Sequence, residues 1–261
     1  MQSPDRFPDR EYGKGGLVGI GTPQANPTVE AEFRRLLPGN TELVTTRLRG
    51  STASSGQRMV DYLENLGVSL AAFDTLRPDV FGFANTAASY LLPAGREDEV
   101  LEKLAGEYGY PIITAAAAVA AALKNIGARK IGIIAPYPAE IVEASVGYWR
   151  GRGLAVLHID RIDIGSDDTR NIYSLRSGDV LPRFEALPDG LDAVLLSGTG
   201  MPSLAAIDAG RRQTGLPVLS SNYCLAWALL RSLGDGRDAW SNTGPTLALV
   251  SVSYTHLRAH E

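Results

Sequence analysis

Five short segments rich in Thr, Ser, Asn, Gly and Pro contain the side chains that could carry chemistry in this chain. Backbone amides at helix N-termini, together with Thr and Asn side chains, suit a carboxylate or an enolate-like anion. Each segment alone would also be typical of an ordinary turn or helix N-cap. Each follows a short apolar run, and none contains Lys, Arg, Asp or Glu: residues 22–27, 85–90, 136–138, 198–203 and 220–223.

Histidine and cysteine are too scarce for several other chemistries. The chain has three histidines, His158, His256 and His260, and one cysteine, Cys224. A Cys/His zinc site cannot be assembled from them, and we expect no metal. A Ser-His-Asp triad would depend on His158, which we interpret as an ordinary strand residue. A phosphate is less favoured than a carboxylate, because the chain has neither a P-loop nor a G-x-G-x-x-G motif.

The composition indicates a globular protein and disfavours several partners. Of the 261 residues, 44% are hydrophobic and 21% are charged, and the net charge of -4 comes with scattered basic residues, so we expect no nucleic-acid binding. The longest apolar stretch, Ile112–Leu123, is too short to span a bilayer, and the polar N-terminus is not a signal peptide, so we expect no membrane association. A single cysteine suits a reducing compartment and predicts a cytoplasmic protein. The sequence leaves open whether the chain forms a homo-oligomer.

The elements that must position the five segments alternate along the chain. Short runs rich in Val and Ile alternate with helical patterns, which predicts an α/β fold with parallel sheets. The expected strands are Gly16–Gly21, Glu42–Leu48, Val80–Ala84, Ile112–Ile113, Lys130–Ala135, Ala155–Ile159, Ala193–Ser197 and Val218–Ser220. The expected helices are Thr28–Leu37, Gln57–Leu66, Ser69–Leu76, Glu97–Tyr108, Ala115–Ile126, Ala139–Arg150, Ser203–Thr214 and Tyr223–Leu233.

An internal repeat predicts how these elements are grouped. Residues 16–33 are similar to 130–149, residues 77–91 to 190–204, and residues 110–127 to 216–234, in the same order. We therefore expect two pseudo-symmetric Rossmann-like (flavodoxin-like) parallel-sheet halves, 16–128 and 129–235, after a polar extension, 1–15, and before a tail, 236–261. Ligands of open parallel sheets bind beyond the carboxyl ends of the strands, so all five segments should surround one site between the halves.

At these segments the chain resembles the aspartate/glutamate racemase superfamily, in its maleate isomerase and arylmalonate decarboxylase branch. The resemblance runs from about Gly16 to Gly234. TPQANPTVE (22–30) is similar to a loop whose asparagine binds a carboxylate, which implies that role for Asn26. APYPAEI (135–141) matches the loop of a pocket tyrosine, here Tyr137, and Asn171 in TRNIYSL corresponds to a further pocket asparagine. ANTAAS (84–89) and SGTGMPSLAAI (197–207) match the two loops that hold catalytic cysteines, and PVLSSNYCLAW (217–227) matches the segment that follows.

The chain departs from this family at both cysteine positions. Asn85 stands at the first, where arylmalonate decarboxylases have glycine, and Gly198 stands at the second. The only thiol, Cys224, lies outside both positions, and Ala118 is its counterpart in the repeat. We interpret Cys224 as a buried packing residue.

Among the family's reactions, decarboxylation requires the fewest catalytic groups, because it needs only an oxyanion hole and one proton donor. It is therefore the reaction that we expect of a chain without these thiols. We expect a cofactor-independent lyase acting on a substituted malonate or a related small carboxylate or dicarboxylate. Its catalytic residues would be Tyr137, Thr86 and Thr199. The alternatives are an isomerase or racemase with a displaced catalytic group, such as Cys224, and a carboxylate-binding or altered-chemistry protein. The expected substrate-binding residues are Asn26, Asn85, Ala87, Asn171, Gly198, Gly200 and Met201.

The last eleven residues, SVSYTHLRAHE, resemble the translation of a sequencing adapter. We expect them to carry no selected function, and His256 and His260 are excluded from the site on that ground.

Overall fold

The computed structural model describes residues 10–51, 54–234, 240–241 and 244–245. The polar extension is therefore described only from residue 10. The final segment, 251–261, lies outside the described residues, and so do His256 and His260.

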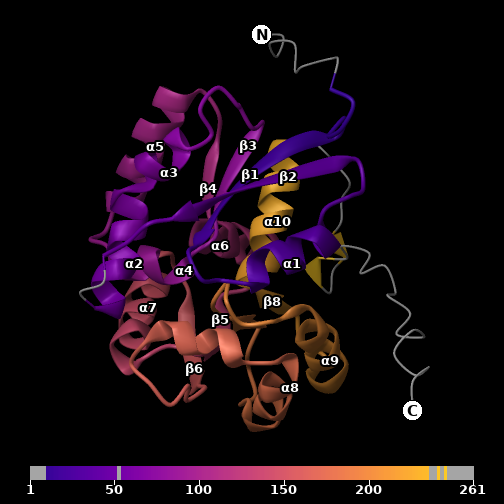
Figure 1. Ribbon diagram of the computed structural model, residues 1–261. Coiled ribbons are helices and arrows are strands. Elements are labelled where there is room, and N and C mark those ends of the chain that lie inside the picture. Colours follow the sequence, from indigo (N-terminus) through magenta and orange to yellow (C-terminus); the bar gives the residue numbers. More distant parts are fainter. Residues whose placement is uncertain (1–9, 52–53, 235–239, 242–243, 246–261) are drawn as a thin grey trace, which may run out of the picture.

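The described strands and helices alternate through most of the chain (Figure 1). The strands are β1 (Gly16–Pro23), β2 (Thr41–Leu48), β3 (Val80–Phe83), β4 (Ile112–Thr114), β5 (Lys130–Ala135), β6 (Ala155–Arg161), β7 (Ala193–Leu196), β8 (Val218–Ser220), β9 (Trp240–Ser241) and β10 (Gly244–Pro245). The α-helices are α1 (Thr28–Leu36), α2 (Ser55–Glu64), α3 (Leu66–Ala71), α4 (Thr86–Leu91), α5 (Arg96–Tyr108), α6 (Ala115–Asn125), α7 (Ala139–Gly151), α8 (Ser177–Val180), α9 (Leu204–Thr214) and α10 (Ser221–Ser232). Two 3-10 helices are η1 (Thr169–Ser174) and η2 (Leu181–Ala186).

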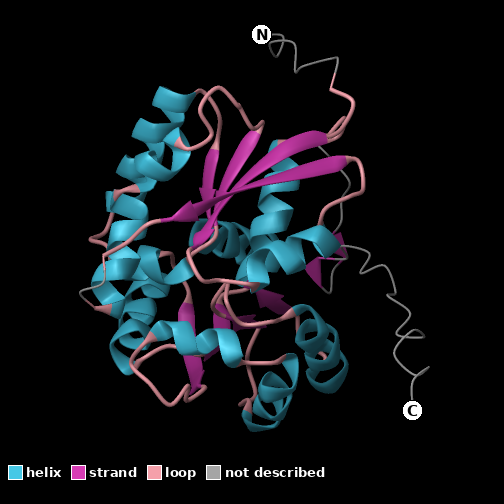
Figure 2. Ribbon diagram, in the orientation of Figure 1, coloured by secondary structure: helices cyan, strands magenta, loops and turns pink. Residues whose placement is uncertain are grey.

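Two four-stranded parallel sheets form the framework of the molecule (Figure 2). The first has the strand order β2-β1-β3-β4 and the second has the order β6-β5-β7-β8. The two orders are equivalent. In each sheet, the strand that comes second in the sequence lies at the edge, and the strand that comes first in the sequence lies next to it. This topology confirms the prediction of an α/β fold with two pseudo-symmetric halves. The short strands β9 and β10 pair with each other in antiparallel fashion.

The central strands are apolar because helices cover both faces of each sheet. Every residue of β1, β3 and β7 is buried, as expected for strands inside a parallel sheet. Gly82 of β3 shows how closely a helix approaches, since a Cβ there would lie 2.7 Å from Ile20 and 2.9 Å from Leu229 of α10. A side chain at position 82 would therefore force the ends of the Ile20 and Leu229 side chains to move.

The last helix of the described residues, α10, crosses from the second half to the first. Although α10 directly follows β8 of the second sheet, it packs against β3 and β4 of the first sheet and against α6 (Figure 1). The domain limits, 16–128 and 129–235, stay a prediction. Because α10 belongs to the second half in sequence and packs against the first, the two halves share part of their core. The strand-end segments of both halves are thereby held together.

Several elements differ from the expectation. Residues 85–90 were expected as a loop, but Thr86–Leu91 form helix α4, because the Asn85 Oδ1 accepts a 2.9 Å hydrogen bond from the Ala88 amide and caps it. The helix expected at 69–76 lies at 66–71 instead, beginning after Asn65 at the end of α2. The sequence pattern did not predict η1, α8 or η2. Within the described residues, no helix is long and apolar enough to cross a membrane.

Candidate functional site

The segments after β3 and β7 contact each other across the boundary between the two halves. Thr199 Oγ1 donates a 2.8 Å hydrogen bond to the carbonyl oxygen of Ala84, and a 3.0 Å bond joins the hydroxyls of Tyr90 and Ser197. All four residues are buried. The carboxyl ends of the two sheets therefore face each other, as the repeat predicted.

A chain of hydroxyl groups links the first half to the second at this point. Thr86 Oγ1 donates a 2.8 Å hydrogen bond to Ser221 Oγ, which also accepts a 3.0 Å bond from the Gly198 amide. A further hydrogen bond joins Thr86 to the Tyr137 hydroxyl. A Cβ at Gly198 would lie 3.2 Å from that hydroxyl oxygen. Three predicted site residues, Tyr137, Thr86 and Gly198, thus lie together beside Ser221, which belongs to the predicted segment 220–223 but was not among the expected site residues.

The first strand-end segment closes the other side of the cluster. Asn26 Nδ2 donates a 3.4 Å hydrogen bond to Thr199 Oγ1, and Asn26 Oδ1 caps α1 by accepting a 2.9 Å bond from the Thr28 amide. Thr28 Oγ1 in turn donates a 2.8 Å bond to the carbonyl oxygen of Gly200. Asn26, Thr199 and Gly200 are therefore brought together as predicted.

The remaining predicted residues divide into two groups. Asn85, Ala87 and Met201 are buried beside the strand ends, and the Asn85 amide also donates a 3.1 Å bond to Met59 Sδ. Asn171, in contrast, is exposed on η1, and its Nδ2 donates a 3.2 Å bond to the carbonyl oxygen of Ile164. The structure therefore does not bring Asn171 into the cluster, because it folds this part of the chain as a 3-10 helix with Asn171 on the outside.

A buried carboxylate positions the segment that carries Thr199. Glu32 of α1 accepts hydrogen bonds from the Ser203 amide at 2.6 Å and from Asn222 Nδ2 at 2.8 Å. Asn222 Nδ2 also donates a 3.0 Å bond to the carbonyl oxygen of Thr199. Burial raises the pKa of Glu32, and these hydrogen bonds oppose that shift. Sequence reasoning missed Glu32 because it lies inside a helix rather than in a strand-end segment.

The electrostatic state of Tyr137 follows from its burial. Removal from water disfavours the phenolate, so the pKa of Tyr137 lies well above its ordinary value near 10. Tyr137 is therefore protonated at neutral pH and can donate a hydrogen bond.

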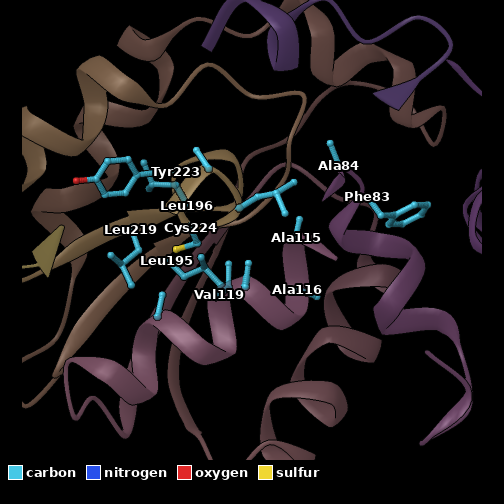
Figure 3. Close-up of a cluster of buried hydrophobic side chains, with 14 of the residues drawn as sticks. Phe83, Ala84, Ala115, Ala116, Val119, Leu195, Leu196, Leu219, Tyr223 and Cys224 are labelled. Carbon is cyan, nitrogen blue, oxygen red and sulfur yellow. The ribbon is translucent and has the colours of Figure 1, made fainter. Parts of the chain in front are cut away.

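The only thiol in the chain is packed in the core. Figure 3 shows Cys224 in a cluster of buried hydrophobic side chains, among Val119, Leu195 and Leu219. Burial raises the pKa of its thiol well above the usual value. A thiol in this environment is not ionised and is a poor nucleophile.

A cavity of about 310 Å³ lies beside the hydroxyl cluster, at the boundary of the two halves. It adjoins the cluster because two of its wall residues directly precede Asn26 and because the Tyr173 ring packs against Gly200. None of the predicted site residues is in its wall. Residues 49–51 directly follow the strand expected at 42–48, so their position after a strand could have indicated them as site residues. The two arginines of the wall, Arg58 and Arg170, lie instead on α2 and η1, which follow no such pattern. The cavity is lined by Gln24, Ala25, Gly50, Ser51, Arg58, Tyr62, Arg170 and Tyr173.

Within the described residues, no group of three or more His, Cys, Asp or Glu side chains is arranged to hold a metal ion. The chemistry available at the cluster is that of hydroxyls, amides and the Asn26 carboxamide. Such groups can donate hydrogen bonds to an oxyanion.

Comparison with known proteins finds similarity to arylmalonate decarboxylases and maleate isomerases. A family model described as arylmalonate decarboxylase matches residues 59–244. A maleate isomerase of Alcaligenes faecalis is 33% identical over 126 residues, which are 48% of this chain and 49% of that protein, so the match spans about half its length. An arylmalonate decarboxylase of Bordetella bronchiseptica is 26% identical over 229 residues, which are 85% of this chain and 92% of that protein.

The solved structure of the maleate isomerase Iso from Pseudomonas putida S16 has a similar fold. It superposes with a TM-score of 0.76 and 24% identity, covering 91% of this chain and 99% of that one. This likeness supports the architecture of two paired sheets.

Proposed function

The chain belongs to the arylmalonate decarboxylase family, and we propose that it is a cofactor-independent lyase that decarboxylates a substituted malonate or a related small dicarboxylic acid. The observation that carries this proposal is the cluster in which Tyr137, Thr86 and the Gly198 amide meet around Ser221. The cluster provides hydrogen-bond donors and has no thiol at positions 85 or 198.

The proposed reaction breaks one carbon–carbon bond. The electron pair of the bond to the departing carboxylate moves into the remaining carboxylate, which becomes an enediolate as carbon dioxide leaves. An oxyanion hole for this negative charge would be formed by the Tyr137 hydroxyl, by the amides near Thr199 and by the Thr86 hydroxyl, whose single proton would turn from Ser221 Oγ towards the substrate. Preorganised donors of this kind are each worth about 3–4 kcal/mol of transition-state stabilisation.

The reaction is completed when the carbon takes up a proton. Tyr137 is the proton donor that we favour, for two reasons. Burial keeps its phenol protonated, and its hydroxyl lies beside Gly198 and Thr86. The phenolate would then regain its proton from solvent. Because burial raises the pKa of Tyr137 above that of an ordinary phenol, Tyr137 is a weaker acid than usual, and this transfer depends on the strongly basic enediolate carbon as acceptor.

The buried thiol argues against the first alternative, an isomerase that uses Cys224 as a displaced nucleophile. Cys224 is buried in an apolar core, and its raised pKa disfavours the thiolate that such chemistry needs. The second alternative is a protein that binds a carboxylate without reaction. We also propose a cytoplasmic location, in keeping with a single cysteine.

Carbon dioxide release from phenylmalonate tests the proposed function. We expect turnover by the wild type, and a decrease of roughly 100-fold or more in Thr86→Val and in Tyr137→Phe, since each variant loses one donor. The matched controls are Thr45→Val in β2 and Tyr110→Phe before β4, which should keep wild-type rates.

Other outcomes would replace the proposal. Formation of fumarate from maleate, without carbon dioxide, would favour the isomerase. Calorimetric binding of malonates without any turnover would favour the binding protein. Wild-type rates in Thr86→Val and Tyr137→Phe would show that the reaction takes place elsewhere.

A further inference from the structure

The wall of the cavity beside the hydroxyl cluster is positively charged. Two guanidinium groups, those of Arg58 and Arg170, line it, and no carboxylate side chain does. Its volume of about 310 Å³ lies at the lower end of the range for small-molecule sites.

The two arginines share one acidic neighbour. Arg170 donates to Asp168 in a bidentate arrangement, with Nε 2.8 Å from Oδ2, and Arg58 Nη2 lies 3.1 Å from Asp168 Oδ1. These interactions hold the pKa of Asp168 far below its ordinary value, so it is ionised. A second acidic residue, Asp61, accepts hydrogen bonds from the Ser51 amide and the Gln57 side chain and is not among the residues that line the cavity. The guanidiniums therefore outnumber the carboxylates at the surface of the cavity.

Arg58 is held in a defined position by both halves of the molecule. The side chain is only 10% exposed, and its Nη2 contacts Ser55 on α2 and Asp168 and Thr169 at η1. These three hydrogen bonds involve Nη2 alone, and a further hydrogen bond joins the guanidinium to the Tyr62 side chain. Among the described residues, these bonds do not occupy all five N–H donors of the guanidinium. A buried cation with unused donors is a strong site for an anion.

Two tyrosines add neutral donors to the same wall. Burial raises the pKa of Tyr62 and raises that of Tyr173 to about 12, so both hydroxyls are protonated at neutral pH. Tyr173 also contacts the position of Gly200, which connects the cavity to the proposed oxyanion hole.

We propose that this cavity binds a further carboxylate on the substituent of the substrate, through Arg58 and Arg170. The inference rests on the proposed function, because it assigns a substrate class to the same site. The preferred substrate is then a malonate with an anionic substituent rather than an aryl group. Planar guanidiniums match a carboxylate in shape and charge, whereas an aryl group here would leave the two guanidiniums with Asp168 as their one shared carboxylate partner.

A matched pair of substrates tests this assignment. Ethane-1,1,2-tricarboxylate carries a third carboxylate and would yield succinate, whereas phenylmalonate carries a ring and would yield phenylacetate. We expect a lower KM for the tricarboxylate in the wild type. Arg170→Gln should raise that KM by roughly 10- to 100-fold, through loss of charge-assisted hydrogen bonds, and should raise it more than the KM for phenylmalonate. Arg150→Gln on the exposed end of α7 is the control with the same charge change, and it should alter neither value.

Calorimetric binding of the two products separates this inference from the proposed reaction. If Arg170→Gln weakens succinate binding more than phenylacetate binding, the carboxylate site stands even if no substrate is decarboxylated. Arg58→Lys, which keeps the charge but not the planar fork, should weaken succinate binding as well. Equal losses for both ligands, no loss for either, or no binding of succinate by the wild type would overturn the inference, even if phenylmalonate is decarboxylated.

Discussion

The Thr86 hydroxyl donates a 2.8 Å hydrogen bond to Ser221 Oγ, although the two residues are 135 positions apart in the chain. Thr86 begins α4 of the first half, and Ser221 begins α10 of the second. The same serine oxygen accepts a 3.0 Å bond from the Gly198 amide. One side chain therefore connects the two strand-end segments that form the proposed oxyanion hole.

Ser221→Ala should destabilise the protein, because it leaves the buried Thr86 hydroxyl and the Gly198 amide without this acceptor. We expect the free energy of unfolding to fall by about 1–3 kcal/mol, measured by denaturant titration. Ser232→Ala at the other end of α10 should change it by less than about 0.5 kcal/mol. Equal stability of Ser221→Ala and the wild type would mean that the link contributes nothing.

Gly198 has a φ of 118°, a backbone conformation that side chains rarely adopt. Gly198 stands at the family's second cysteine position, but any side chain here would require a strained backbone, and its Cβ would lie 3.2 Å from the Tyr137 hydroxyl oxygen. Gly198→Ala should lower the free energy of unfolding by about 1–3 kcal/mol. Gly147→Ala, inside α7 with open space around its Cβ, should instead raise it by about 0.5–1 kcal/mol. Thermal unfolding of both variants measures these changes. An unchanged free energy of unfolding in Gly198→Ala would contradict the prediction of backbone strain at this position.

Cys224 should be dispensable for the reaction. In the folded protein it should resist iodoacetamide, because its thiol is buried and its pKa is raised. Cys224→Ala should keep turnover within about twofold, which contact with the reacting carbon would not allow. Mass spectrometry of the treated protein and assays of the variant provide the two readouts. Rapid alkylation together with loss of turnover would revive the displaced-thiol isomerase.

Glu32 should make stability depend on pH in a defined direction. Burial raises its folded pKa above the ordinary value of 4.5, so the folded state binds the proton more tightly than the unfolded state. The contribution from Glu32 is then complete below about pH 4.5 and is lost as pH rises through the raised pKa. The difference in free energy of unfolding between wild type and Glu32→Gln should therefore fall as pH increases from about 4.5. A difference that stays constant with pH would contradict the shift.

Local pattern determined much of the architecture. Continuous apolar runs such as 193–196 can be buried only inside a sheet covered on both faces, and their alternation with amphipathic helices implied parallel strands. The repeat then implied two halves, and the strand ends indicated where Asn26, Thr86, Tyr137 and Thr199 would meet. The inferences about the fold were correct because each depends on neighbours within one element or on the order of elements, whereas the roles of these four residues in a site stay predictions.

Only the tertiary structure decided how the two halves are joined and what surrounds the site. The crossing of α10, the Ser221 link, the 3.1 Å contact of Arg58 with Asp168 and the outward position of Asn171 have no local signal. Each depends on which surfaces pack together across more than a hundred residues, or on how an irregular segment folds between its neighbours. Periodicity reports the face that a residue presents, and it does not report the partner that this face meets.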